Sequence, residues 1–139
     1  MRAAGCAWRP PGDQIEFEDI DDPALRVRDG VLEFLDTPHR PKFVMDAAKG
    51  WLAYISKDDQ LFIKTFPVEP EGYYGDVAGN NVSVWYYKDK VVEIEPMSPW
   101  KTIPPGNCYS FTENWYLYDY PYPDDKKADL DKVRKLINP

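Results

Sequence analysis

Residues 82–96 read VSVWYYKDKVVEIEP, and this stretch decides the fold class. Two runs rich in β-branched and aromatic residues, 82–87 and 90–95, stand on either side of Lys88 and Asp89. Apolar runs of this kind around a short polar break are typical of a β-hairpin. The stretch therefore predicts two adjacent antiparallel strands.

Two further hairpins are predicted upstream. LRVR at 25–28 and VLEFL at 31–35 flank Asp29-Gly30, a dipeptide that favours a tight turn because glycine accepts positive φ. WLAYIS at 51–56 and LFIKTF at 61–66 are separated by four polar residues. The first of these hairpins could instead be one irregular strand with a bulge.

The rest of the chain also favours β structure over helix. Fourteen prolines disfavour long helices before the C-terminus. Residues 67–81 have the composition of a loop, and residues 109–118 alternate as a long strand with one largely apolar face. We therefore expect an all-β, antiparallel β-sandwich in a single domain.

The C-terminal segment 124–138 differs in character. Leu130, Val133, Leu136 and Ile137 recur at spacings of three and four among charged residues, which predicts an amphipathic helix. Asp124 or Asp125 is the expected N-cap, since a carboxylate is favourable at the start of a helix.

Composition restricts the partners. The 139 residues fit one domain, and 17 basic against 24 acidic side chains leave a net charge of −7 with no basic stripe. Nucleic acid and anionic membrane surfaces are therefore not expected partners. No apolar run is long enough to span a membrane.

The N-terminus and the cysteines predict the compartment. Residues 1–12 are expected to be flexible, and they lack the continuous apolar core of a signal peptide. Cys6 and Cys108 form neither a CxxC pair nor a disulfide framework. A cytoplasmic protein is predicted, or a secreted one if a leader has been removed.

Glu93 and Glu95 are the candidate carboxylates. Counting by two places both on one strand face, with Val92 and Ile94 on the other. A two-residue turn at 88–89 would pair Tyr86 with Val91 and set Glu93 opposite Val84, where apolar neighbours raise a carboxyl pKa and suit it to proton transfer. The alternative is that both glutamates line the solvated face of the strand.

Two longer motifs follow one another here. Residues 91–99 read VVEIEPMSP and 103–117 read IPPGNCYSFTENWYL: a glutamate on a strand, a Pro-Gly turn, then a strand with an aromatic, a threonine and another aromatic. This order resembles the C-terminal strands of the aldose 1-epimerase (galactose mutarotase-like) superfamily. With GWLAY at 50–54 and LFIKTF at 61–66, it looks closer still to an uncharacterised bacterial branch of that superfamily.

The resemblance covers Lys42 to Tyr118 and implies a β-sandwich that presents a sheet face to sugars. It implies Glu93 as general base, with a histidine as the acid. The enzymes of the superfamily use two upstream histidines, whereas this chain has only His39. The likeness spans the second half of a family domain, and half a sandwich leaves edges that pairing usually closes, so a homodimer is expected.

Two functional hypotheses follow. In the first, the protein binds a sugar or a sugar-like small molecule without full mutarotase activity, through stacking rings and a carboxylate. The residues concerned are Tyr73, Tyr74, Trp85, Tyr87, Glu95 and Trp115, with Glu93. In the second, Glu93 is the base of a sugar-active enzyme, and the acid comes from His39, a tyrosine or a partner subunit. Many of the rings could instead belong to the core.

Other sites are weaker hypotheses. A glycosidase would need Glu93 beside Glu113 or Asp76 across a cleft. The IPPG turn before a strand is also similar to the second motif of the cupin family, but the metal-binding histidines are missing. A single histidine excludes two-histidine metal sites, so neither a metal nor a cofactor is expected. A purely structural dimeric domain remains the last alternative.

Overall fold

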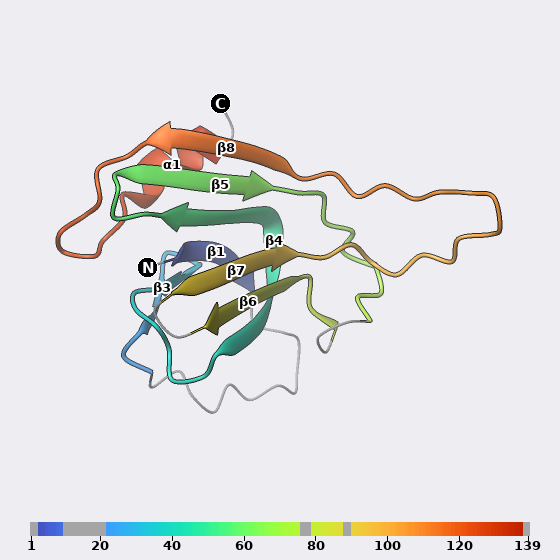
Figure 1. Cartoon of the computed structure of the whole chain (residues 1–139), viewed down its shortest axis with the longest axis horizontal. Helices are drawn as coiled ribbons and strands as arrows, with labels where there is room; N and C mark the ends of the chain where they lie inside the picture. The colour runs from blue at the N-terminus through green and yellow to red at the C-terminus, as the bar shows by residue number, and fades with distance from the viewer. Residues whose placement is uncertain (1–2, 10–21, 76–78, 88–89, 138–139) are drawn as a thin grey trace.

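The computed structural model describes residues 3–9, 22–75, 79–87 and 90–137, and the side chains from residue 22 onward. Eight strands precede one helix along the chain (Figure 1). Their bounds are β1 Ala3–Arg9, β2 Leu25–Arg28, β3 Val31–Phe34, β4 Lys42–Ile55, β5 Gln60–Thr65, β6 Val82–Tyr87, β7 Val91–Pro96, β8 Asn114–Asp119 and α1 Leu130–Ile137.

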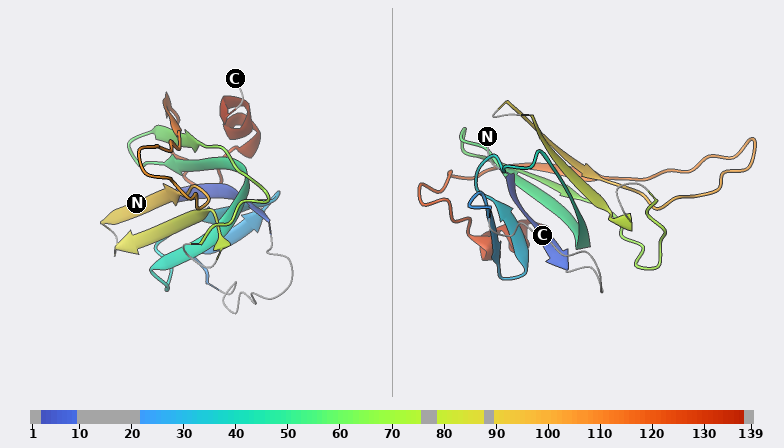
Figure 2. Two further views of the ribbon diagram at one scale, coloured as in Figure 1. Left: turned by 90° about the vertical axis from the view of Figure 1, so that its right-hand side faces the viewer. Right: turned by 90° about the horizontal axis from the view of Figure 1, so that it is seen from below.

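The strands form two antiparallel sheets that share β4. Sheet A has the order β2-β3-β1-β4-β5-β8, and sheet B consists of β4, β6 and β7. The side views show β6 and β7 as a separate layer beside sheet A (Figure 2). This arrangement confirms the predicted all-β, sandwich-like fold with one C-terminal helix.

The bend of β4 joins the two sheets. Its first residues, Lys42 to Met45, pair with β6, whereas Trp51 to Ile55 pair with β5. Gly50 lies at the bend with φ of 65°, and its carbonyl accepts a hydrogen bond from Phe66 N at 2.9 Å. Asn81 Oδ1 accepts another from Ala47 N at 2.7 Å, which satisfies a buried backbone donor where the ladder is interrupted.

Two apolar clusters hold the layers together. The first fills the space between the sheets and includes Met45, Leu52, Val82, Val84 and Tyr86. The second lies between sheet A and α1 and contains Trp51, Leu61, Ile63, Tyr120, Leu130 and Val133. The amphipathic helix predicted from its spacing thus packs on the sheet.

The helix begins later than the sequence indicates. Asp129, and not Asp124 or Asp125, is its N-cap, because Asp129 Oδ1 accepts a hydrogen bond from Lys132 N at 3.0 Å. Asp125 Oδ1 instead accepts from Lys127 N at 2.9 Å in a turn. Lys126, with φ of 59°, cannot continue a helix, which is why α1 starts at Leu130.

The N-terminus contributes a strand to sheet A. Ala3–Arg9, within the range expected to be flexible, form β1 between β3 and β4. The remaining residues of that range lie outside the described part of the chain. No helix among the described residues is long and apolar enough to cross a membrane.

The predicted long strand at 109–118 is shorter than expected. β8 begins only at Asn114, and residues 97–113, here called the arm, form no strand. The arm leaves the end of β7, turns at its tip and returns to β8, and it projects well beyond the sheets (Figures 1 and 2). The leg that returns to β8 carries the alternation at 109–113 that suggested a longer strand.

Candidate functional site

The β6–β7 hairpin forms as predicted but in a different register. Tyr87 pairs with Val91 and Tyr86 with Val92, so Glu93 lies opposite Trp85 and not Val84. Three residues, and not two, therefore lie between Tyr87 and Val91, the pair at the end of the hairpin. The shift by one residue exchanges the neighbours of Glu93, because side chains alternate between the faces.

The two faces of this hairpin have different surroundings. Val84 and Tyr86 are buried in the core, and Val92 and Ile94 pack against the same cluster. Glu93 and Glu95 are exposed on the opposite face. The expected shared face is confirmed, and of the two interpretations of Glu93 the solvated one is correct.

Trp85 and Tyr87 stand on the same outer face as the glutamates. Their rings are nearly parallel, at an angle of 21° with centroids 5.7 Å apart, and Tyr87 is 48% exposed. Trp85 pairs with Glu93 on one side and with Lys42 on the other. These three residues, one each from β4, β6 and β7, therefore form a row across sheet B. We call Lys42, Trp85, Tyr87, Glu93 and Glu95 the outer platform. Lys42 was not recognised in the sequence, because the pairing of β4 with β6 is a long-range contact.

Tyr73 and Tyr74 lie in a loop apart from this hairpin, and their side chains diverge. Tyr74 is buried, and its hydroxyl accepts a hydrogen bond from Glu69 N at 3.1 Å, so it is a packing residue. Tyr73 is exposed and meets the ring of Trp100 edge-on at 5.6 Å. The structure thus does not bring the pair together as one stacking surface.

Trp115 lies on β8, on the face of sheet A that looks toward sheet B. Its indole Nε1 donates to Glu113 Oε2 at 2.8 Å, and Lys64 Nζ lies 4.9 Å from its ring centroid. Lys64 Nζ also lies 3.2 Å from Glu113 Oε2 and donates to the carbonyl of Ile94 at 2.9 Å. Lys64 therefore joins β5 to β7.

These contacts bear on the glycosidase hypothesis. Lys64 pairs with Glu113, and Lys101 pairs with Glu69 at 2.6 Å. Glu113, considered as the second glycosidase carboxylate, is occupied by Lys64 and Trp115. Asp76, the other candidate, lies outside the described residues.

His39 contacts Asp22 and not Glu93 in the described part of the chain. Its backbone N–H donates to Asp22 Oδ2 at 2.7 Å, its Nδ1 lies 3.8 Å from the same oxygen, and its side chain is 81% exposed. Burial would raise the pKa of Asp22, but hydrogen bonds from Ala24 N and His39 N outweigh it and lower that pKa. Asp22 thus orders the loop before β4 as a charged carboxylate.

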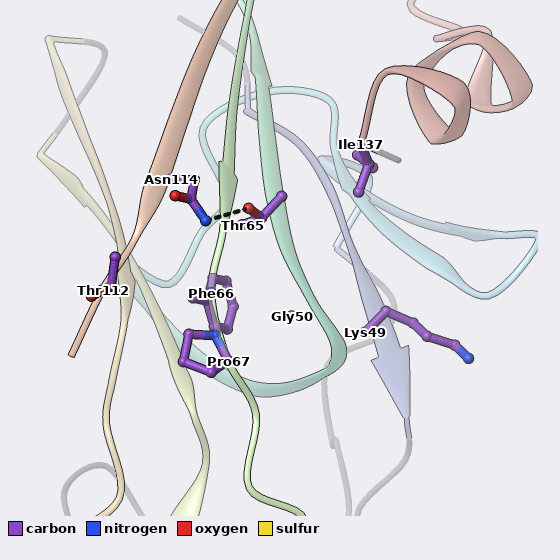
Figure 3. Close-up of a pocket in the computed structure, with 8 residues that line it drawn as sticks. All are labelled: Lys49, Gly50, Thr65, Phe66, Pro67, Thr112, Asn114 and Ile137. Carbon is purple, nitrogen blue, oxygen red and sulfur yellow. Dashed lines mark hydrogen bonds between the residues drawn. The ribbon is translucent and has the colours of Figure 1, made fainter. Parts of the chain in front are cut away.

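An open pocket of about 420 Å³ lies elsewhere, at the base of the arm (Figure 3). Its lining comes from the β4 bend, the end of β5, the arm, β8 and the helix terminus. The residues are Lys49, Gly50, Thr65, Phe66, Pro67, Thr112, Asn114 and Ile137. None of the residues selected from the sequence lines it, and no local motif indicated it. Figure 3 draws one hydrogen bond within the pocket, from Asn114 Nδ2 to Thr65 Oγ1, and it is long at 3.5 Å.

The described residues contain no group of three or more His, Cys, Asp or Glu side chains that could hold a metal ion.

No protein-family model matches the chain, and neither a curated protein nor a solved structure matches it. The resemblance to the aldose 1-epimerase superfamily therefore stays a prediction.

Proposed function

We propose that the outer platform binds a carbohydrate or a similar small molecule. The observation that carries this proposal is the pair of nearly parallel rings of Trp85 and Tyr87, set in one row with Glu93 and Lys42. The pair stands on a solvent-facing sheet surface rather than in the core.

The chemistry of this row suits a sugar. A sugar ring is apolar on its faces and carries hydroxyls at its edge, and aromatic rings offer flat apolar area for the faces. The Glu93 carboxylate accepts hydrogen bonds from hydroxyls, and the Lys42 ammonium donates them. Glu95, two residues along the same face, extends the acidic edge of the platform.

The proposal is limited to binding. A general base needs an acid on the other side of the anomeric centre, and the sequence offers one histidine for that role. His39 is engaged by Asp22. No contact among the described residues places an acid next to Glu93.

Titration of a panel of sugars by calorimetry and by Trp fluorescence, beside polarimetry of fresh α-glucose and α-galactose, tests the proposal. We expect saturable binding of at least one sugar with no increase in the rate of mutarotation. Tyr87→Ala should weaken that binding at least tenfold, because it removes one ring of the pair. The control is Tyr73→Ala, which changes another exposed tyrosine away from the platform and should bind as the wild type does. Absence of binding across the panel, or equal loss in both variants, would contradict the proposal.

A further inference from the structure

One part of sheet A lacks a covering layer. Sheet B covers the facing side of sheet A up to Lys64, whose side chain donates a hydrogen bond to the backbone carbonyl of Ile94 in β7. Beyond that contact Phe62, Trp115 and Leu117 stand on the same face of β5 and β8, and Trp115 and Leu117 are 65% and 64% exposed. We call these three residues the open face.

The strand beside the open face has an unpaired edge. β8 pairs with β5 alone among the described strands, so its other edge presents free backbone donors and acceptors. An exposed apolar face next to a free strand edge is the usual setting for pairing with another chain.

The arm also has backbone groups without hydrogen-bond partners. Residues 101–110 are all exposed, and the backbone hydrogen bond found within 101–113 among the described residues is the one at the tip, from Asn107 N to Pro104 O at 3.1 Å. Residues 101–113 thus make no backbone pairing with the rest of the described chain, whereas Met97 N and Trp100 N donate to the carbonyls of Asn81 and Tyr73 at 2.9 and 2.8 Å and hold the start of the arm. Trp100, Ile103 and Tyr109 are exposed along the arm.

The arm has the length needed to cover an open face. The returning leg from Pro105 to Glu113 spans roughly 30 Å at about 3.3 Å per extended residue, and the six residues of β8 span roughly 20 Å. The arm points away from its own β8 (Figure 1), so it does not cover its own open face.

The charge distribution favours a second copy of this chain over a basic partner. The protein carries a net charge of −7, but residues 97–113 contain only Lys101 and Glu113, and both are paired within the chain. Lys64, beside the open face, is paired with the same Glu113. Two acidic molecules can therefore meet through the arm and the open face without bringing like charges together.

The available area is close to what a dimer requires. Trp100, Ile103, Tyr109, Trp115 and Leu117 offer roughly 550 Å² of side-chain surface per copy, at about 200 Å² for a fully accessible large side chain. A stable interface takes about 800 Å² from each partner, and the arm backbone with its polar side chains supplies the difference.

From these observations we propose that two copies form a symmetric dimer by exchanging arms. One leg of each arm adds its backbone to the free edge of β8 of the other copy, and the apolar side chains of the arm extend over the open face beside that edge. Because the two contacts are the same, the interface is isologous and closes at two copies.

Sedimentation equilibrium and light scattering at about 50 µM test the assembly. We expect a dimer for the wild type and a monomer for Leu117→Lys on the open face and for Ile103→Lys on the arm. Ile103 is exposed and belongs to neither apolar cluster, so its substitution leaves folding intact even if Leu117→Lys does not. The control Val27→Lys changes an exposed apolar residue of β2, away from the arm and the open face, and should remain dimeric. A monomeric wild type at this concentration, or a dimer that survives Ile103→Lys, would overturn the proposal.

Cross-linking tests the exchange itself. Cys108 is exposed near the arm tip. A Cys6→Ser chain that keeps Cys108 is mixed with a Cys6→Ser, Cys108→Ser chain that carries Leu117→Cys, and a thiol cross-linker with a reach of about 10 Å is added. We expect a covalent heterodimer, and Val27→Cys in place of Leu117→Cys should give none. Equal cross-linking of both would show that the arms do not lie on the open face.

Discussion

Glu33 is buried between two arginines. Its carboxylate oxygens lie 2.7 Å from Arg26 Nε and 2.8 Å from an Arg28 terminal nitrogen, and its side chain is only 2% exposed. The same arginines donate to the carbonyls of Lys126 and Ala128. This group therefore ties the β2–β3 hairpin to the segment that leads into α1.

Burial acts to raise the pKa of Glu33, but hydrogen bonds from Arg28 and Arg26 outweigh it, so that pKa lies below its usual value. The stability gained from the ionised carboxylate is thus fully present above pH about 4.3, the ordinary value for Glu. It is lost as the pH falls through the lower folded pKa, because the unfolded chain then binds the proton more readily.

Glu33→Gln should lower the free energy of unfolding by about 2–3 kcal/mol at pH 7, because it leaves two arginines without their carboxylate. The loss should shrink toward pH 3, because below pH about 4.3 the unfolded wild-type chain binds the proton more readily than the folded one and the stabilisation by the charge declines. Urea denaturation at both pH values measures the effect. Glu69→Gln, which breaks an exposed pair with Lys101, is the control and should cost under about 1 kcal/mol. Equal losses in the two variants would refute the role given to burial.

Glu93→Gln tests the platform at its carboxylate. Because Glu93 is exposed, we expect a change of less than about 0.5 kcal/mol in the free energy of unfolding. Sugar affinity should fall at least tenfold, since the amide removes the charged acceptor beside Trp85. Calorimetry with the best ligand of the panel measures it.

Glu95→Gln is the comparison for that variant, since Glu95 stands on the same face opposite Ser83. We expect a smaller loss of affinity than for Glu93→Gln. A larger loss for Glu95→Gln would mean that the ligand sits two residues further along β7 than proposed.

At the scale of elements, the bend of β4 depends on a residue without a side chain. A Cβ on Gly50 would fall inside contact distance of the Phe66 carbonyl oxygen, which is backbone and cannot turn away. The positive φ of Gly50 adds strain for any other residue.

Gly50→Ala should therefore destabilise the protein by more than about 2 kcal/mol, with the clash added to the dihedral strain. Gly30→Ala separates the two causes, because Gly30 has a similar φ of 72° and open space around it. We expect a loss of about 1 kcal/mol for Gly30→Ala from strain alone. Chemical denaturation of both variants measures the difference, and equal losses would argue against the clash.

The start of α1 gives a second test at this scale. Asp129→Ala removes the N-cap and should lower the free energy of unfolding by about 1 kcal/mol. Thermal unfolding followed by circular dichroism measures it. Asp124→Ala should be nearly silent, and a larger loss there would restore the helix start expected from the sequence.

For the whole molecule, arm exchange links stability to protein concentration. A dimer that forms only from folded chains is stabilised by mass action, so Tm should rise by several degrees between about 1 and 100 µM. Differential scanning calorimetry measures the shift. Leu117→Lys should have a Tm that does not depend on concentration, and the same independence in the wild type would contradict the dimer.

Features that depend on neighbours in sequence were predictable. The Asp29-Gly30 turn forms with positive φ at both residues, between the two strands that the alternation indicated. The shared face of Glu93 and Glu95 and the apolar face of α1 follow from the periods of strand and helix, which the chain carries locally. For the candidate site, this was enough to place both glutamates and Trp85 on β6–β7.

Features that depend on distant residues were decided only by the tertiary structure. The loop of β6–β7 holds three residues, which moved Glu93 from Val84 to Trp85, and the pairing of Lys42 with Trp85 joins positions far apart in the chain. Residues 109–113 looked like part of a strand because their side chains alternate, yet no other segment of the described chain pairs with them. Turn chemistry and periodicity act over a few residues, whereas register, burial and ion pairing depend on which surfaces the folded chain brings together.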